Sequence, residues 1–224
     1  MTTRIDEETI DTMSREASQE LEALIPQILF LGGERSVFTP MIIQTAEVVA
    51  LYRVCKRHGW DARESGELLY EVAEAYYAQS MSPMMKKNTG LLMYSWPVKR
   101  MWRKATQETM KREYPENWVG EYVEGDGRTF EYGLDFTECA ASKFLKRHGA
   151  VEVAPYICLG DYARMRALGI GFKRTHSINM GGELCDFRFV KGHETPRAWP
   201  PKCLEEYRYY LETRGKVPAS LKGK

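Results

Sequence analysis

The sequence lacks a long apolar run and an excess of charge of either sign. No segment approaches the roughly twenty apolar residues that a membrane-spanning helix needs. The 32 Lys and Arg residues nearly balance the 31 Asp and Glu residues, whereas nucleic acids and acidic membranes select a basic excess. The acidic, polar beginning of the chain does not resemble a signal peptide. We therefore expect neither nucleic acid nor membrane as a partner, and a cytoplasmic location.

Several short catalytic motifs are also missing. The sequence contains no GxGxxG, no Walker phosphate-binding loop, no HExxH and no GxSxG. Nothing therefore supports a dinucleotide-binding, nucleotide-hydrolysing or serine-hydrolase function. The five cysteines form no CxxC pair and no regular disulfide spacing. This pattern favours free, metal-bound or catalytic thiols in a reducing compartment.

The hydrophobic period changes near residue 115. Before it, apolar residues recur at helical spacing, which predicts helices over residues 6–25, 39–58, 61–78 and 83–114. Asp61 is the expected N-cap of the third helix, and Gly90 and Pro97 should interrupt the fourth.

After that point, alternation predicts two hairpins that enclose two helices. The expected elements are strands 118–124 and 129–136, helices 137–148 and 155–168, strands 170–179 and 184–190, and a last helix over 200–214. The prediction is an α+β fold. A helical N-terminal region, residues 1–115, packs on a ββααββ unit, residues 116–224, which has a small antiparallel sheet and a C-terminal helix. The two regions are expected to share one core.

Three of the five cysteines lie between residues 135 and 190. Cys139 and Cys158 should each lie in the first turn of a helix, where free N–H groups and the helix dipole favour a thiolate. Asp161 follows Cys158 by three residues and shares its helical face. The competing interpretation is that these thiols are small buried hydrophobic groups.

The second hairpin places charged residues next to the third thiol. A turn centred on Gly181 and Gly182 would pair Arg174 with Phe189, His176 with Phe187 and Ile178 with Cys185. Arg174, His176 and Cys185 would then face the core. The opposite, solvated face would carry Lys173, Thr175, Ser177, Asp186 and Arg188. A buried Arg174 needs a partner, which could be a thiolate, a bound carboxylate or an acid in the core.

A metal site is a rival use of the same thiols. Cys139, Cys158 and Cys185 could hold zinc with His176 or Asp161 as a fourth ligand, although their spacing is not that of a zinc finger. We therefore predict no cofactor and keep zinc, or another thiol-bound metal, as the alternative.

Four segments in succession, D-F-T-E-C, A-P-Y-I-C-L-G-D, K-R-T-H-S-I and G-G-E-L-C-D-F-R-F, resemble the L-2-amino-thiazoline-4-carboxylic acid hydrolase family. The resemblance covers about residues 118–190. It implies a bacterial hydrolase that opens a cyclic amidine or a related C–N bond, with a carbamoyl-cysteine as the product. The fold it implies is similar to that of 4-vinyl-reductase-type domains, which bind small ligands and can hold zinc through cysteines. Ser177 stands where such a zinc site would have a thiol.

The resemblance also suggests roles for individual residues. Its expected catalytic residues are Cys139, Cys158, Cys185, Asp161 and Asp186, with Cys158 or Cys185 as the nucleophile. Its expected substrate-binding residues are Arg174, Thr175, His176 and Arg188, which would hold a small substrate with a carboxylate. The alternative is a small-molecule-binding or metal-binding sensor without turnover. A second copy of the chain is kept as a possible partner.

Overall fold

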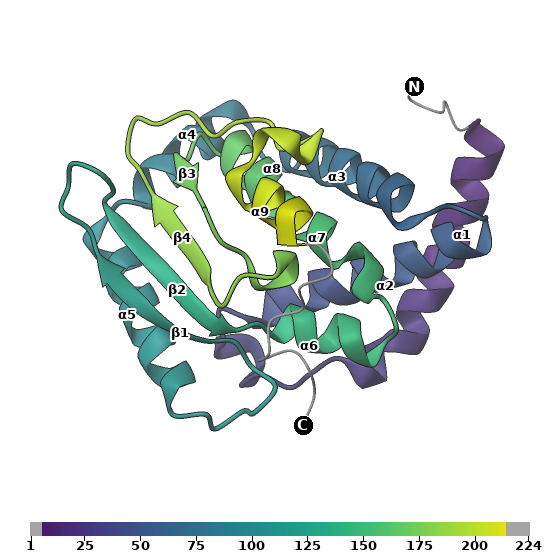
Figure 1. Ribbon diagram of the computed structural model, residues 1–224, viewed down its shortest axis with the longest axis horizontal. Coiled ribbons are helices and arrows are strands. Elements are labelled where there is room, and N and C mark those ends of the chain that lie inside the picture. Colours follow the sequence, from purple (N-terminus) through teal and green to yellow (C-terminus); the bar gives the residue numbers. More distant parts are fainter. Residues whose placement is uncertain (1–5, 214–224) are drawn as a thin grey trace.

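The computed structural model describes residues 6–213 and confirms the α+β fold (Figure 1). The helices of the first half are α1 Glu7–Leu24, α2 Thr39–Arg57, α3 Ala62–Gln79, α4 Pro83–Leu92 and α5 Trp96–Met110. Asp61 caps α3 as predicted: its carboxylate accepts the N–H groups of Arg63 and Glu64. Within the described part of the chain, no helix is long and apolar enough to cross a membrane.

The helix expected over residues 83–114 is two helices, and neither Gly90 nor Pro97 divides them. The break falls at residues 93–95, between α4 and α5. Pro97 lies in the first turn of α5, where its missing N–H costs nothing. Gly90 lies inside α4, where a Cβ would come within 2.4 Å of the Leu168 carbonyl oxygen. This glycine therefore serves close packing of α4 on the chain after α8.

The second half builds a four-stranded antiparallel sheet in the order β1-β2-β4-β3. Its strands are β1 Val119–Glu124, β2 Tyr132–Glu138, β3 Phe172–Lys173 and β4 Cys185–Phe189. On one face, Leu134 pairs with Phe187 and Phe136 with Cys185. Asp135 pairs with Asp186 on the other face, which is polar. Helix α5 packs on β1 and lies behind the sheet in Figure 1.

Between the hairpins the chain forms α6 Ala140–Arg147, α7 Ala154–Ile157 and α8 Leu159–Ala167, and it ends in α9 Glu205–Thr213. The single helix expected over residues 155–168 is divided at Cys158. The helix expected from residue 137 begins only at Ala140, because β2 continues to Glu138. The last helix is shorter than expected, since residues 201–203 form a separate 3₁₀ turn; residue 214 of that prediction lies outside the described residues.

The predicted second hairpin is wrong in its length and register. The first of its strands is β3, which has two residues instead of ten, and Phe172 rather than Arg174 pairs with Phe189. Residues 178–180 form a 3₁₀ turn before Gly181, whose φ is +88°. Thr175 and His176 donate their backbone N–H groups to the side chain of Asp186. One backbone bond, from the Asp186 N–H to the His176 carbonyl at 3.4 Å, still joins the two segments, but the side-chain bonds take the N–H groups that a regular ladder would use, and the strand ends at Lys173.

Apolar residues from both halves of the chain pack together. One buried cluster includes Phe38 before α2, Trp102 of α5, Phe136 of β2, Leu159 of α8 and Tyr207 of α9. Phe38 stacks on Trp118 with ring centroids 5.3 Å apart and meets Phe136 edge to face. Such contacts hold the end of β2, where the cysteine-containing segment begins, against the N-terminal helices.

Candidate active site

Arg174 is the charged centre of the region that contains the cysteines. Its side chain is only 1% exposed, and three aromatic rings, of Tyr162, Phe172 and Phe187, lie within 5.6 Å of the guanidinium carbon. Such an environment would expel an unpaired charge. The charge is retained because α9 supplies Glu206, a fully buried carboxylate.

Glu206 and Arg174 form a two-bond ion pair. Arg174 Nε donates to Glu206 Oε2 at 2.6 Å, and Nη2 donates to Oε1 at 3.0 Å. Nη1 donates to Asp161 Oδ2 at 2.6 Å, and Nη2 also donates to the Cys158 carbonyl oxygen at 2.9 Å. Burial opposes the charge, but the two carboxylates outweigh it and raise the pKa of Arg174 well above its usual value. Of the partners that the sequence left open for Arg174, the core acid is the one found.

Cys158 lies at the junction of α7 and α8 and is the N-cap of α8. Its sulfur has two neighbouring donors, Asn179 Nδ2 at 3.3 Å and Ser177 Oγ at 3.5 Å. The Oδ1 atom of Asn179 is buried and has no hydrogen-bond partner. Two residues after Cys158, a Cβ built on Gly160 would meet nothing within 4 Å. The thiol therefore has polar groups beside it, and the open space in the first turn of α8 lies at Gly160, on a different face of the helix.

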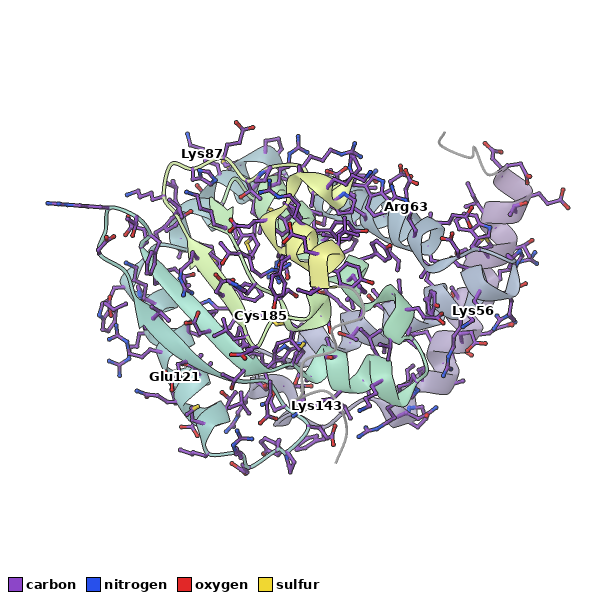
Figure 2. The ribbon with its side chains drawn as sticks, viewed as in Figure 1. Lys56, Arg63, Lys87, Glu121, Lys143 and Cys185 are labelled. Carbon is purple, nitrogen blue, oxygen red and sulfur yellow. The ribbon has the colours of Figure 1, made fainter. Side chains whose placement is uncertain are left out.

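The other two thiols lie close by. Cys185 begins β4, is buried, and lies near the middle of the molecule in Figure 2. Its sulfur accepts the Ile178 N–H at 3.2 Å and lies 3.9 Å from Ser177 Oγ, so one hydroxyl contacts both Cys158 and Cys185. Cys139 is the N-cap of α6, and its sulfur accepts the Ser142 N–H at 3.4 Å.

The expectation of readily ionised thiols is wrong for this structure. Burial raises the pKa of Cys139 to about 12, although N–H groups of α6 act in the opposite direction. Burial also raises the pKa of Cys158, which the charge of Arg174 only partly offsets, and raises that of Cys185 well above its usual value. Helix N-termini do meet two of these thiols, but desolvation is the larger effect.

Asp186, Thr175 and His176 form a separate cluster beside the cysteines. Asp186 was expected on the solvated face but is only 9% exposed, and Ser177, expected there too, is buried. His176 was expected in the core, yet its side chain is 52% exposed. The early end of β3 explains the positions of Ser177 and His176, because the chain after Lys173 no longer alternates as a strand does. Asp186 does lie on the predicted face of β4, but the segment of Thr175 and His176 bonds to its side chain and buries it.

Arg188 lies across the polar face of the sheet. It donates to Asp135 through Nη1 at 2.5 Å and Nη2 at 3.2 Å, and its side chain covers Gly133, where a Cβ would come within 2.8 Å of Nη1. Cys185 occupies the opposite face of the same strand. The geometry therefore does not bring Arg188 together with the thiols.

The sequence did not identify Glu206, Ser177 or Asn179 as site residues. Glu206 had no local signal, since it is 32 residues from Arg174 in a helix with several acids. Ser177 lies within the K-R-T-H-S-I segment that carries the resemblance and Asn179 directly follows that segment, and their polar side chains before the Gly181 turn were the available hint.

Two further features bear on the chemistry of the region. A hollow of about 860 Å³ opens between α3, the C-terminal end of α8 and residues 192–195, at the other end of α8 from Cys158. Among residues 6–213, no group of three or more His, Cys, Asp or Glu side chains is arranged to hold a metal ion. The zinc alternative therefore gains no support from the positions of Cys139, Cys158 and Cys185.

Comparison with known families adds an independent finding. The model of the family described as L-2-amino-thiazoline-4-carboxylic acid hydrolase matches residues 40–189. The match begins at the first turn of α2 and ends at the last residue of β4, so it includes the helical segment that the sequence resemblance did not cover. No curated protein and no solved structure matches the chain.

Proposed function

The chain belongs to the L-2-amino-thiazoline-4-carboxylic acid hydrolase family, and on this premise we propose that it hydrolyses a small cyclic amidine with Cys158 as the nucleophile. Membership of this family supports a hydrolase activity with the thiazoline as substrate. The observation that carries the choice of Cys158 is its surroundings: it is less buried than Cys185, two polar side chains contact its sulfur, and it begins α8.

The proposed reaction balances with water as the co-reactant. The Cys158 sulfur adds to the carbon between the ring sulfur and the ring nitrogen, and the bond from that carbon to the ring nitrogen breaks as the nitrogen takes up a proton. Water then adds to the same carbon and loses a proton, and the bond to Cys158 breaks with return of a proton to its sulfur. The product is S-carbamoyl-cysteine, which retains the exocyclic nitrogen of the substrate.

The raised pKa of Cys158 is compatible with this role because the substrate is itself a base. An amidine nitrogen can accept the thiol proton, which activates the nucleophile and prepares the leaving nitrogen in one transfer. Ser177 and Asn179 would stabilise negative charge on the sulfur by hydrogen bonds.

We assign Arg174 a positioning role in this reaction. Four hydrogen bonds to protein atoms occupy most of its donors, so a bidentate grip on a substrate carboxylate would require breaking the Glu206 pair. Through its bond to the Cys158 carbonyl, Arg174 instead fixes the start of α8 and the direction of the thiol.

The test is incubation of the reduced protein with L-2-amino-thiazoline-4-carboxylate. Mass spectrometry follows carbamoyl-cysteine, and titration of free thiol identifies the bond that breaks, because only cleavage of the C–S bond releases a thiol. Cys158→Ser should abolish turnover, whereas Cys203→Ser, at an exposed position, should not. An active Cys158→Ser variant would show that Cys158 is not the nucleophile. Release of free thiol would show that the C–S bond of the ring breaks and not the C–N bond. Tight binding without any product would favour the sensor alternative.

A further inference from the structure

The side chain of Asn179 has one end against the Cys158 sulfur and the other end unused. Its Nδ2 atom lies 3.3 Å from that sulfur. Its Oδ1 atom is buried and accepts no hydrogen bond from any of the described residues. A buried acceptor without a donor costs free energy, which a ligand recovers when it brings an N–H group to that point. The unpartnered oxygen next to the proposed nucleophile therefore indicates what kind of ligand fits beside it.

A hydrogen-bonded turn holds the backbone of Asn179. This residue is the middle one of the 3₁₀ turn Ile178–Met180. The Ser177 carbonyl accepts the N–H groups of Met180 at 3.0 Å and of Gly182 at 2.9 Å, and Met180 is fully buried. Because the turn is already formed, the amide oxygen needs no rearrangement of the chain to receive a donor.

The two ends of the amide are close enough to serve one small substrate. The oxygen and nitrogen of an amide are bonded to the same carbon and lie about 2.2 Å apart, so Oδ1 is within about 5.5 Å of the Cys158 sulfur. In an amidine under attack by this sulfur, the exocyclic nitrogen is bonded to the attacked carbon. Two covalent bonds and one N–H···O hydrogen bond of about 2.9 Å span that distance. Cys158 and Asn179 are both only partly buried, so the pair is not sealed in the core.

The exocyclic nitrogen is the substrate group that matches this oxygen. It carries hydrogen whether the amidine is neutral or protonated, so it can donate to Oδ1. It also stays bonded to the attacked carbon from the substrate to S-carbamoyl-cysteine, so one hydrogen bond can persist through the reaction. A carbonyl oxygen has no hydrogen to give, and the contact therefore does not assist loss of this nitrogen as ammonia.

We propose that Asn179 is a specificity-determining residue, whose Oδ1 atom accepts a hydrogen bond from the exocyclic nitrogen of the amidine while Nδ2 contacts the Cys158 sulfur. This inference rests on the proposed function and adds the group that selects the substrate. The ligand class is a cyclic amidine with hydrogen on its exocyclic nitrogen. An analogue with oxygen at that position would bring two acceptors together and leave Oδ1 unpaired.

The first test compares two ligands that differ only in this respect at the exocyclic position. Isothermal titration of the Cys158→Ser protein, which should bind without turnover, measures Kd for L-2-amino-thiazoline-4-carboxylate and for 2-oxo-thiazolidine-4-carboxylate. Loss of a hydrogen bond that leaves a buried partner unpaired weakens binding by about 10- to 100-fold, so we expect the amino compound to bind more tightly by that factor. Equal or tighter binding of the oxo compound would overturn the proposal, since an oxygen on the ligand fits Nδ2 and not Oδ1.

The second test changes the residue itself. Asn179→Leu removes both polar atoms at similar volume, and the preference for the amino compound should fall by about tenfold or more. Asn88→Leu, the same substitution at an exposed position on α4, should leave the preference unchanged. Circular dichroism checks the fold, and Asn179→Ala takes the place of the Leu variant if that variant is unfolded. An unchanged preference in a folded Asn179 variant would overturn the proposal.

The outcomes separate this inference from the proposed function. If carbamoyl-cysteine forms and Cys158 is required, but the preference does not depend on Asn179, the proposed function stands and the role of Asn179 is wrong. An active Cys158→Ser variant would refute the nucleophile, whereas the preference, then measured as KM against the inhibition constant of the oxo compound, would still test Asn179. If neither compound binds, both proposals fail.

Discussion

Replacing Glu206 with Ala should destabilise the protein strongly, because it leaves a buried guanidinium with too few partners. The variant loses both hydrogen bonds between Glu206 and Arg174, at 2.6 and 3.0 Å. Asp161 remains, but its side chain is 37% exposed, so water screens its attraction for Arg174. The Cys158 carbonyl also remains, as an uncharged acceptor.

Removing one partner of a buried ion pair typically costs about 3–5 kcal/mol. Both groups of this pair are almost completely buried, so we expect a loss in that range for the free energy of unfolding. That is a large part of the free energy of unfolding of a folded protein, which is ordinarily about 5–15 kcal/mol. With a urea slope of about 3 kcal/mol per molar, the unfolding midpoint should fall by roughly 1–1.7 M.

Urea unfolding followed by circular dichroism measures this effect. Glu205→Ala is the matched control, since Glu205 is the same residue type on the same helix but exposed, and its midpoint should barely move. Replacing Arg174 and Glu206 together with Met should recover most of the loss, because no fully buried charge is left unpaired; Asp161 also loses Arg174, but its side chain is 37% exposed to water. Equal midpoints for Glu206→Ala and Glu205→Ala would refute the reasoning.

Three further predictions follow from packing and titration. Gly66→Ala places a Cβ 2.4 Å from the Tyr156 ring and should lower the free energy of unfolding, measured in urea, by about 1–3 kcal/mol. Gly160→Ala is the control, because a Cβ there has open space and should cost nothing. Equal effects of the two substitutions would contradict this. Burial raises the pKa of Cys55 to about 11 and of Cys139 to about 12, so these thiols lose their protons at lower pH in the unfolded chain than in the folded protein. The free energy of unfolding should therefore stay constant below about pH 8.5 and fall from about pH 9 toward 12. A flat profile of unfolding free energy against pH would contradict this. Iodoacetamide at neutral pH should label exposed Cys203 well before Cys139, Cys158 or Cys185, as peptide mapping would detect.

The helices of the first half were predictable because their signals are local. The expected ranges for α1, α2 and α3 agree with the structure to within about two residues, the usual uncertainty of helix ends. Asp61 with Glu64 is a capping box that involves only neighbouring residues. The predicted break between α4 and α5 was misplaced because Gly90 is needed for close packing against a group that is distant in sequence, the Leu168 carbonyl.

The second hairpin was not predictable in detail, because a side chain decides where β3 ends. Alternation in the sequence continues past Lys173, and only the structure shows that Asp186 takes the N–H groups of Thr175 and His176. Likewise, the pattern indicated that Arg174 needs a partner, but Glu206 comes from a helix 32 residues away. The segment around Arg174 shows that its charge needs a partner, but which residue becomes the partner depends on the tertiary fold.

The behaviour of the thiols follows from the balance of two effects, of which only one can be read in sequence. Cys139 and Cys158 do lie at helix N-termini, where dipoles and N–H groups favour a thiolate. Burial acts more strongly in the opposite direction and keeps both thiols protonated at neutral pH. A nucleophile in this setting gains from a basic substrate, since an amidine that takes the proton of Cys158 creates a thiolate only when it is bound. The same burial that lowers reactivity toward other electrophiles would then restrict the thiol to its own substrate.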